Sequence, residues 1–188
     1  MQALVVYESL YGNTAAVGQA IAASLRAHGL KVDVGPVSKI DPSEAAGVEL
    51  LVVGGPTHAH GMSRASTRKT AVDDKANTYA EPTVAPGLRE WIGDLPPGAG
   101  RLAAAFDTRI DKPVLLTGSA AKGIARRLER RGCLLIVRPE SFLVSTGNQL
   151  LEGETAHATR WGRQVAQGSR RLRQPELPAP GARGQGRG

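Results

Sequence analysis

The chain has 188 residues, of which 41% are hydrophobic and only 4% aromatic, so one domain with a core of Val, Leu, Ile and Ala is expected. No apolar run approaches the roughly 20 residues of a membrane-spanning helix, which argues against membrane insertion. The N-terminal residues lack the charged region and cleavage site of a signal peptide. The single cysteine, Cys133, excludes an internal disulfide and fits a reducing cytoplasm.

Apolar runs that suit buried strands alternate along the chain with segments of helical spacing. The predicted strands are Ala3–Tyr7, Lys31–Val34, Val48–Val53, Leu102–Phe106 and Cys133–Val137, the last one continued by Phe142–Val144. The predicted helices are Thr14–His28, Pro86–Gly93, Ala120–Arg131 and Glu152–Leu172. This alternation predicts one α/β domain over residues 1–173, with helices on both faces of a doubly wound parallel sheet.

Two segments fall outside this alternation. Met62–Ala85 carries many charges and few apolar residues, and stretches of this kind are often functional or mobile. Residues 174–188 are rich in Pro, Gly and Arg and are predicted to be a disordered tail. The basic tail is read either as a solubilising extension or as a contact for an anionic surface.

The turn after the first strand, Glu8–Thr14, has the composition of a phosphate loop. Its small and hydroxyl residues lie between a buried strand and a helix N-terminus, where free backbone N–H groups and the helix dipole favour an anion. Gly12 allows a close approach of the backbone. The absence of Lys and Arg argues against a P-loop and for neutral donors. The alternative is a plain capped turn with Asn13 or Thr14 as the N-cap.

Ser-x-Tyr-Gly-Asn-Thr after an N-terminal strand resembles the signature with which flavodoxins wrap the phosphate of FMN. Ser9, Gly12, Asn13 and Thr14 match that signature, whereas Tyr11 stands where flavodoxins usually have threonine. The resemblance covers residues 1 to about 165 and implies a five-stranded parallel sheet of order 2-1-3-4-5. It also implies FMN as the cofactor, with its phosphate held by Ser9, Leu10, Tyr11, Gly12, Asn13 and Thr14.

The third predicted strand ends in Gly54-Gly55-Pro56-Thr57, which resembles the flavodoxin loop beside the isoalloxazine ring. That loop often carries a stacking aromatic residue, and here His58, His60 or Met62 would have to serve. The resemblance therefore implies cofactor contacts from Pro56, Thr57, His58, Ala59, His60 and Gly61. Exposed histidines are the alternative, and a metal site is disfavoured because no further ligand cluster is evident nearby.

The fourth predicted strand leads into the other ring-contacting loop of the flavodoxin pattern. The resemblance assigns cofactor contacts to Phe106, Asp107, Thr108 and Arg109, with the backbone of the last two facing the pyrimidine edge. Many flavodoxins have a tyrosine here, and this sequence has none after Phe106. Phe106 is alternatively a core residue, and Asp107 and Arg109 a surface ion pair. Gly118–Gly123 resembles a helix cap and is a minor candidate for a second phosphate site.

The helix Ala120–Arg131 is strongly basic, whereas electron-shuttling flavodoxins are usually acidic. Its cations indicate either a solvated helix face or a docking surface for an acidic redox partner or anionic substrate. Nucleic-acid binding is disfavoured because no reading helix or aromatic platform is visible. Cys133 begins a buried strand and is predicted to pack there rather than to react.

The sequence thus predicts an FMN-binding, flavodoxin-like redox protein of the cytoplasm, in which the flavin performs the chemistry. No catalytic triad or carboxylate pair is apparent, so an electron carrier and a small flavin reductase are equally compatible with the motifs. The alternative function is a flavodoxin fold that has lost FMN and acts as a binding or interaction module, which Tyr11 and the missing stacking aromatics would favour.

Overall fold

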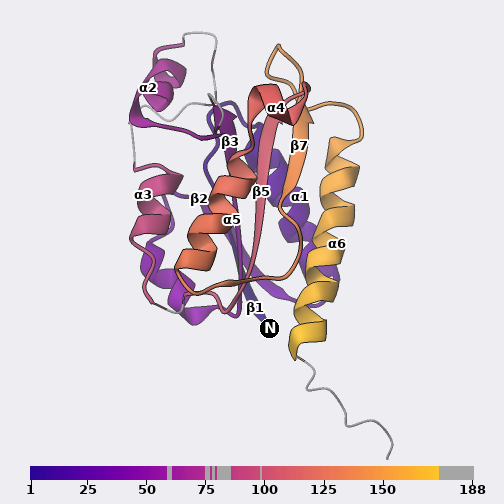
Figure 1. Ribbon diagram of the computed structural model, residues 1–188. Coiled ribbons are helices and arrows are strands. Elements are labelled where there is room, and N and C mark those ends of the chain that lie inside the picture. Colours follow the sequence, from indigo (N-terminus) through magenta and orange to yellow (C-terminus); the bar gives the residue numbers. More distant parts are fainter. Residues whose placement is uncertain (59–60, 75–76, 78, 80–85, 98, 174–188) are drawn as a thin grey trace, which may run out of the picture.

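The computed structural model describes residues 1–58, 61–74, 77, 79, 86–97 and 99–173. Its centre is a parallel sheet with helices on both faces, which confirms the predicted three-layer α/β fold (Figure 1). The strands are β1 (Gln2–Tyr7), β2 (Lys31–Pro36), β3 (Leu50–His58), β4 (Gly61–Met62), β5 (Leu102–Ile110), β6 (Leu134–Leu135) and β7 (Glu140–Val144). The helices are α1 (Asn13–Ala27), η1 (Pro42–Gly47), α2 (Ala65–Asp73), α3 (Leu88–Gly93), α4 (Val114–Thr117), α5 (Ala120–Arg130) and α6 (Glu154–Arg173).

The strand order is β2-β1-β3-β5-β6, as the resemblance implied, but the predicted last strand is divided. β6 and β7 both pair with β5, from Ala103↔Leu135 and again from Phe106↔Glu140. Between these pairs β5 advances by fewer residues than its partner, so part of the partner segment bulges out of the sheet. Pro139 lies in this segment, and it has no N–H to donate to a ladder. The exact count of five strands was therefore wrong, although β6 and β7 share one position beside β5.

Both faces of the sheet are covered by apolar helices. Alternate residues of β1, β3 and β5 pack against α3 and α5 on one face, where Trp91 and Ile124 are buried. The intervening residues pack against α1 and α6 on the other face, around Phe106, Phe142 and Trp161. Cys133 is buried in the first of these clusters. Burial raises the pKa of its thiol, which disfavours the reactive thiolate and agrees with a packing role.

β3 and β5 extend beyond the apolar runs from which they were predicted. Their carboxyl-terminal halves contain glycine and polar residues, yet they continue the parallel ladder through Gly55↔Asp107 and Pro56↔Thr108. Ladder hydrogen bonds use only the backbone, so the ladder can continue where the apolar pattern stops. Consequently the two loops expected to flank a flavin begin on rigid strands.

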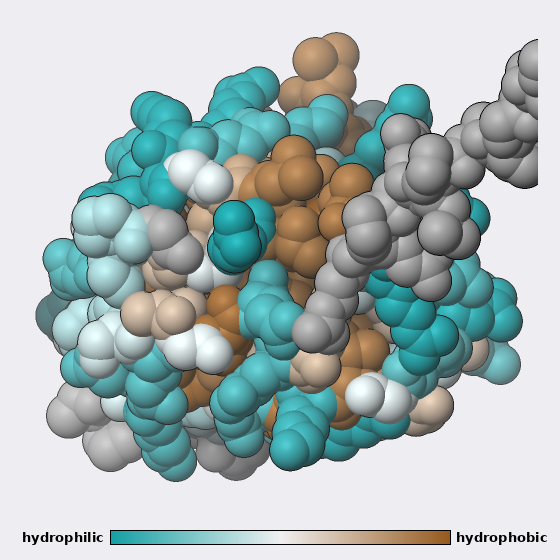
Figure 2. All heavy atoms as spheres, turned by 90° about the horizontal axis from the view of Figure 1, so that it is seen from below, coloured by the Kyte–Doolittle hydropathy of each residue, from teal (hydrophilic) through white to brown (hydrophobic). Residues whose placement is uncertain are grey.

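The elements missed by the sequence pattern are short or polar, namely η1, α2, α4 and the antiparallel strand β4. α2 lies within the segment Met62–Ala85, of which residues 75–76, 78 and 80–85 are outside the described part. The predicted tail, residues 174–188, is also outside it. Within the described ranges, no helix combines the length and the apolar character needed to cross a membrane. Viewed from below, hydrophobic residues gather in the middle of the face, with hydrophilic ones around them (Figure 2).

Candidate functional site

The turn between β1 and α1 has the backbone shape expected of an anion-binding loop. Gly12 occupies the N-cap position of α1 with a left-handed φ of +86°, a conformation that favours glycine. The Ser9 hydroxyl accepts a hydrogen bond from the N–H of Ala15 at 3.2 Å, which closes the loop onto the first helical turn. Neither Asn13 nor Thr14 is the N-cap, so the plain capped turn considered from the sequence does not describe this loop.

Several donors of this loop are left without an acceptor. Within the described part of the chain, the backbone N–H groups of Tyr11, Gly12, Asn13 and Thr14 make no hydrogen bond. They lie at the N-terminus of the 15-residue helix α1, where the helix dipole adds positive potential. Free N–H groups at such a terminus favour an anionic ligand, and a phosphate has the required charge and acceptor oxygens.

The polar side chains of the loop connect it to neighbouring elements. Thr14 is buried, and its hydroxyl lies 2.7 Å from the hydroxyl of Thr108 at the end of β5. The Asn13 amide donates to the carbonyl of Asn148, between β7 and α6, at 2.8 Å. These contacts fix the loop relative to the sheet. The Ser9 hydroxyl acts only as an acceptor in its bond with Ala15, so its proton is available to a ligand.

A cavity of about 250 Å³ lies between the loop and the carboxyl ends of β3 and β5. It brings together nine of the residues assigned to cofactor binding from the sequence, namely Leu10, Tyr11, Asn13, Thr14, Pro56, Thr57, His58, Thr108 and Arg109. Ile110, Val144 and Asn148 complete its lining and were not predicted. Ligands of open α/β sheets bind at this position, beyond the carboxyl ends of the strands where the strand order reverses.

Of the other predicted site residues, Ser9 and Gly12 belong to the loop, whereas Gly61, Phe106 and Asp107 do not line this cavity. Phe106 is fully buried and packs edge-on against Phe142 and Trp161, so its side chain is a core residue. Gly61 lies in β4 and lines a different groove. Ala59 and His60 are outside the described residues.

Asp107 is a fully buried carboxylate and makes no surface ion pair with Arg109. Its Oδ2 accepts from the hydroxyls of Thr57, at 3.0 Å, and Ser119, at 2.8 Å. It also accepts from the N–H of Ala121 in the first turn of α5, at 2.8 Å. Asp107 therefore links the carboxyl ends of β3 and β5 to the N-terminus of α5, next to the cavity-lining Thr57.

The same contacts exclude a second phosphate site at Gly118–Gly123. The N–H of Ala120 donates to the Thr57 hydroxyl at 2.8 Å, and that of Lys122 donates to the Ser119 hydroxyl at 3.3 Å. With Ala121 paired to Asp107, the first turn of α5 is already satisfied by protein groups, one of them a carboxylate. That minor hypothesis was wrong.

His58 lies on the cavity wall, and its surroundings change the pKa of its side chain. Burial lowers the pKa of its imidazole from the usual value, and the nearby carboxylate of Glu8 opposes this only in part. Its Nε2 is buried and has no hydrogen-bond partner in the described part of the chain. A neutral imidazole with an unpaired nitrogen, in a residue that lines a cavity, is suited to pair with a polar ligand atom.

The stability of the protein should therefore depend on pH through His58. The unfolded state binds a proton near pH 6.5, whereas the folded state binds it only at lower pH, so stability is lost as the pH falls through this range. We expect the melting temperature to decrease between pH 7.5 and pH 5, and to decrease less in His58→Gln. Equal pH dependence in the two proteins, measured by thermal unfolding, would show that His58 is not the group responsible.

The segment after β4 also contacts the loop, which the sequence pattern did not reveal. The Asn77 amide donates to the carbonyl of Leu10 at 2.7 Å, and the Tyr11 hydroxyl lies 3.4 Å from Asp74. The ring of Tyr79 lies beside Gly12, 3.2 Å from the position that a Cβ would take there. The only sequence signal for these contacts was the composition of Met62–Ala85, which is typical of functional or mobile segments.

Glu8 anchors this segment to the end of β1. Its buried carboxylate accepts hydrogen bonds from the Ser63 hydroxyl and from the N–H of Leu88, the latter at 2.7 Å. The guanidinium of Arg68 lies 3.5 Å from both Ser63 and Glu90. No group of three or more His, Cys, Asp and Glu side chains within the described ranges could hold a metal ion.

Comparison with known proteins places these features in context. The sequence profile described as flavodoxin matches residues 5–90. No curated protein matches the chain significantly. The fold is similar to that of a flavodoxin from the domain Archaea, with a TM-score of 0.63 and 20% identity over 90% of this chain and 99% of that one.

Two further structures have the same fold. Flavodoxin 2 from Bacillus cereus has a TM-score of 0.64 and 18% identity over 89% of this chain and 99% of that one. The rubredoxin oxygen:oxidoreductase from Desulfovibrio gigas has a TM-score of 0.60 and 16% identity, and its match covers 90% of this chain but 36% of that larger one.

Proposed function

We propose that this chain, whose residues 5–90 match the flavodoxin profile and whose fold is similar to that of flavodoxins, is a redox protein that binds FMN and acts as an electron carrier or in a small flavin-dependent reduction. The observation that carries this proposal is the row of unpaired backbone N–H groups from Tyr11 to Thr14 at the start of α1. When bound, FMN supplies the chemistry, because it accepts and donates one or two electrons or a hydride. The protein supplies position and electrostatics.

The residues present fit a flavin phosphate. The free N–H groups and the Ser9 hydroxyl are neutral donors that converge on one turn, and charge-assisted hydrogen bonds to a phosphate are about twice as strong as neutral ones. Thr14 can donate to the same phosphate while it accepts from Thr108. The dianionic phosphate would also be stabilised by the dipole of α1.

The cavity offers two walls for the rest of the cofactor. Pro56, Thr57 and His58 form one wall, and Thr108 and Arg109 form the other. We assign the predicted contacts with the flavin ring to these residues. His58 Nε2 is buried and unpaired among the described residues, so a polar group of the ring would relieve the cost of its burial. The buried Cys133, which has no cysteine partner in this chain, accords with a proposed location in the cytoplasm.

We predict that protein purified from cells, or reconstituted with FMN, is yellow and holds one flavin per chain. The measurement is a visible spectrum of the full-length protein, followed by release and quantification of the flavin. A reductant such as dithionite should bleach the bound flavin, and air should restore it. A colourless protein that fails to quench FMN fluorescence at micromolar concentration would contradict the proposal and favour a fold that no longer binds FMN.

A further inference from the structure

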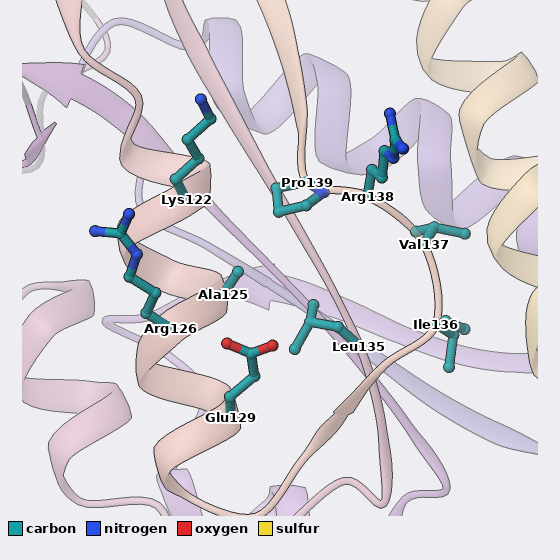
Figure 3. Close-up of a pocket in the computed structure, with 9 residues that line it drawn as sticks. All are labelled: Lys122, Ala125, Arg126, Glu129, Leu135, Ile136, Val137, Arg138 and Pro139. Atoms are coloured by element: carbon teal, nitrogen blue, oxygen red, sulfur yellow. The ribbon is translucent and has the colours of Figure 1, made fainter.

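The helix α5 lies between two grooves. The first, of about 630 Å³, separates α5 from the segment that joins β6 to β7 (Figure 3). Its floor is apolar, with Leu135 and Pro139 opposite Ala125 (Figure 3). The second, of about 570 Å³, lies between α5, α4 and the hairpin of β3 and β4. Lys122 and Arg126 line both grooves, so the two form one continuous surface, which we call the α5 face.

The α5 face carries an excess of positive charge, because the first groove has the carboxylate of Glu129 against the cations Lys122, Arg126 and Arg138. The second groove is lined by cationic side chains and by no carboxylate among the residues described; the cations are Arg89, Lys122, Arg126, Arg127 and Arg130. None of these five takes part in an ion pair within the described part of the chain. Burial and the charges of Arg127 and Arg64 lower the pKa of Arg89, which is held in place by the carbonyls of Met62 and Ser63.

Exposed leucines lie beside these cations. Leu115 is 92% exposed and Leu116 is 63% exposed, both on the short helix α4. Leu115 also lines the second groove, together with Val114. Adjacent exposed apolar side chains on a folded domain are unusual, and when polar groups surround them they mark contact sites for other proteins. Small anions and nucleic-acid phosphates bind through charge and hydrogen bonds, to which exposed leucines contribute nothing.

The α5 face adjoins the candidate flavin site. In the hairpin, Thr57 pairs with Met62 and His58 pairs with Gly61. Thr57 and His58 line the cavity, whereas Gly61 and Met62 line the second groove. One two-stranded hairpin therefore separates the two spaces, and a molecule docked on the α5 face would be next to a flavin bound in the cavity.

We propose that the α5 face is the docking surface for an acidic electron-transfer protein. Complementary charge steers such a partner to the surface and orients it, and the exposed leucines of α4 add an apolar contact beside the cations. The proposal rests on the proposed function only for the redox step, in which a one-electron carrier is oxidised as FMN gains that electron. The docking itself requires only the residues described above.

The test uses an oxidised, acidic plant-type [2Fe–2S] ferredoxin as the probe and the full-length protein. Binding is measured by isothermal titration calorimetry at low salt and again at 300 mM NaCl. Lys122→Glu/Arg126→Glu reverses two exposed charges that line both grooves. Arg160→Glu/Arg163→Glu makes the same change in net charge at exposed positions of α6, on the other face of the sheet. Thermal unfolding confirms that both variants are folded.

We expect the parent to bind the probe and to lose affinity as salt is added. The α5 variant should lose at least about tenfold in affinity, whereas the α6 control should lose much less, because close charge pairs dominate docking. Equal losses in both variants, or no binding by the parent, would overturn the proposal. Tighter binding to duplex DNA than to ferredoxin, with the same residues required, would assign the surface to nucleic acid instead.

The binding measurement does not depend on flavin, so its failure is distinct from a failure of the proposed function. Where the protein does hold FMN, a second readout follows. Stopped-flow reduction of the flavin by reduced ferredoxin should slow as salt is raised, and it should slow further in Lys122→Glu/Arg126→Glu. A rate that rises with salt would overturn the proposal, because it would indicate repulsion between the two proteins.

Discussion

Gly12→Val is expected to abolish FMN binding while the domain stays folded. Gly12 has a φ of +86°, which is strained for a β-branched residue by about 1–3 kcal/mol, and its N–H is one of the unpaired donors of the loop. A loop that relaxes to relieve this strain would turn its donors away from the phosphate. We expect the affinity for FMN to fall at least about 100-fold, or roughly 3 kcal/mol, in a fluorescence titration.

Gly132→Val is the matched control for this variant. Gly132 has a φ of +87°, and no other residue lies within 4 Å of the position its Cβ would take. It follows α5, at the opposite end from the first turn that contacts Asp107. Both variants should have a lower melting temperature in circular dichroism melts, because each places valine at a positive φ, but only Gly12→Val should lose the flavin. If Gly12→Val binds FMN like the parent, the loop is not the phosphate site, and if it unfolds the domain, the glycine is required for folding.

Gly54→Ala is expected to cost about 3 kcal/mol or more of the free energy of unfolding. A Cβ at this position in β3 would lie 2.1 Å from Cζ of Phe106 and 2.3 Å from both neighbouring ring carbons. The Phe106 ring is fully buried and packs edge-on against Phe142 and Trp161, so it cannot move away from a Cβ without displacing other core rings. Overpacking of a core usually costs 1–3 kcal/mol, and this contact is at the severe end of that range.

Thermal unfolding would measure this effect as a fall of roughly 10 °C in the melting temperature. Gly47→Ala serves as the control, because nothing lies within 4 Å of a Cβ at that exposed position. A melting temperature for Gly54→Ala close to that of the control would show that the core near Phe106 is looser than described. Gly54 thus has a packing role in addition to its place in the Gly54–Thr57 loop motif.

Local patterns predicted most of the fold. The apolar runs located the strands, and helical spacing located α1, α5 and α6 to within a few residues. They could not predict the carboxyl-terminal halves of β3 and β5, where the parallel ladder continues although the apolar pattern has stopped. The division of the last strand at Pro139 was likewise missed, because its two parts read as one interrupted apolar segment.

The candidate site was predictable where one stretch of chain supplies it. The turn Glu8–Thr14, with a left-handed Gly12, follows directly from its sequence. Contacts between distant residues were not predictable, as in the pairs of Thr14 with Thr108 and of Asn13 with Asn148. Asp107 shows the same limit, since a carboxylate after a strand gives no sign that a helix N-terminus will be placed against it.

The most direct test of the account compares the dissociation constants of FMN and riboflavin for the full-length protein. The two ligands share the ring and differ in the phosphate, so their difference measures what the Ser9–Thr14 loop contributes. Two or more hydrogen bonds to a charged group are worth about 1.5–3 kcal/mol each. The account therefore predicts that FMN binds at least about 100-fold more tightly than riboflavin. Comparable dissociation constants would contradict it, because the unpaired donors of the loop would then have no part in holding the cofactor.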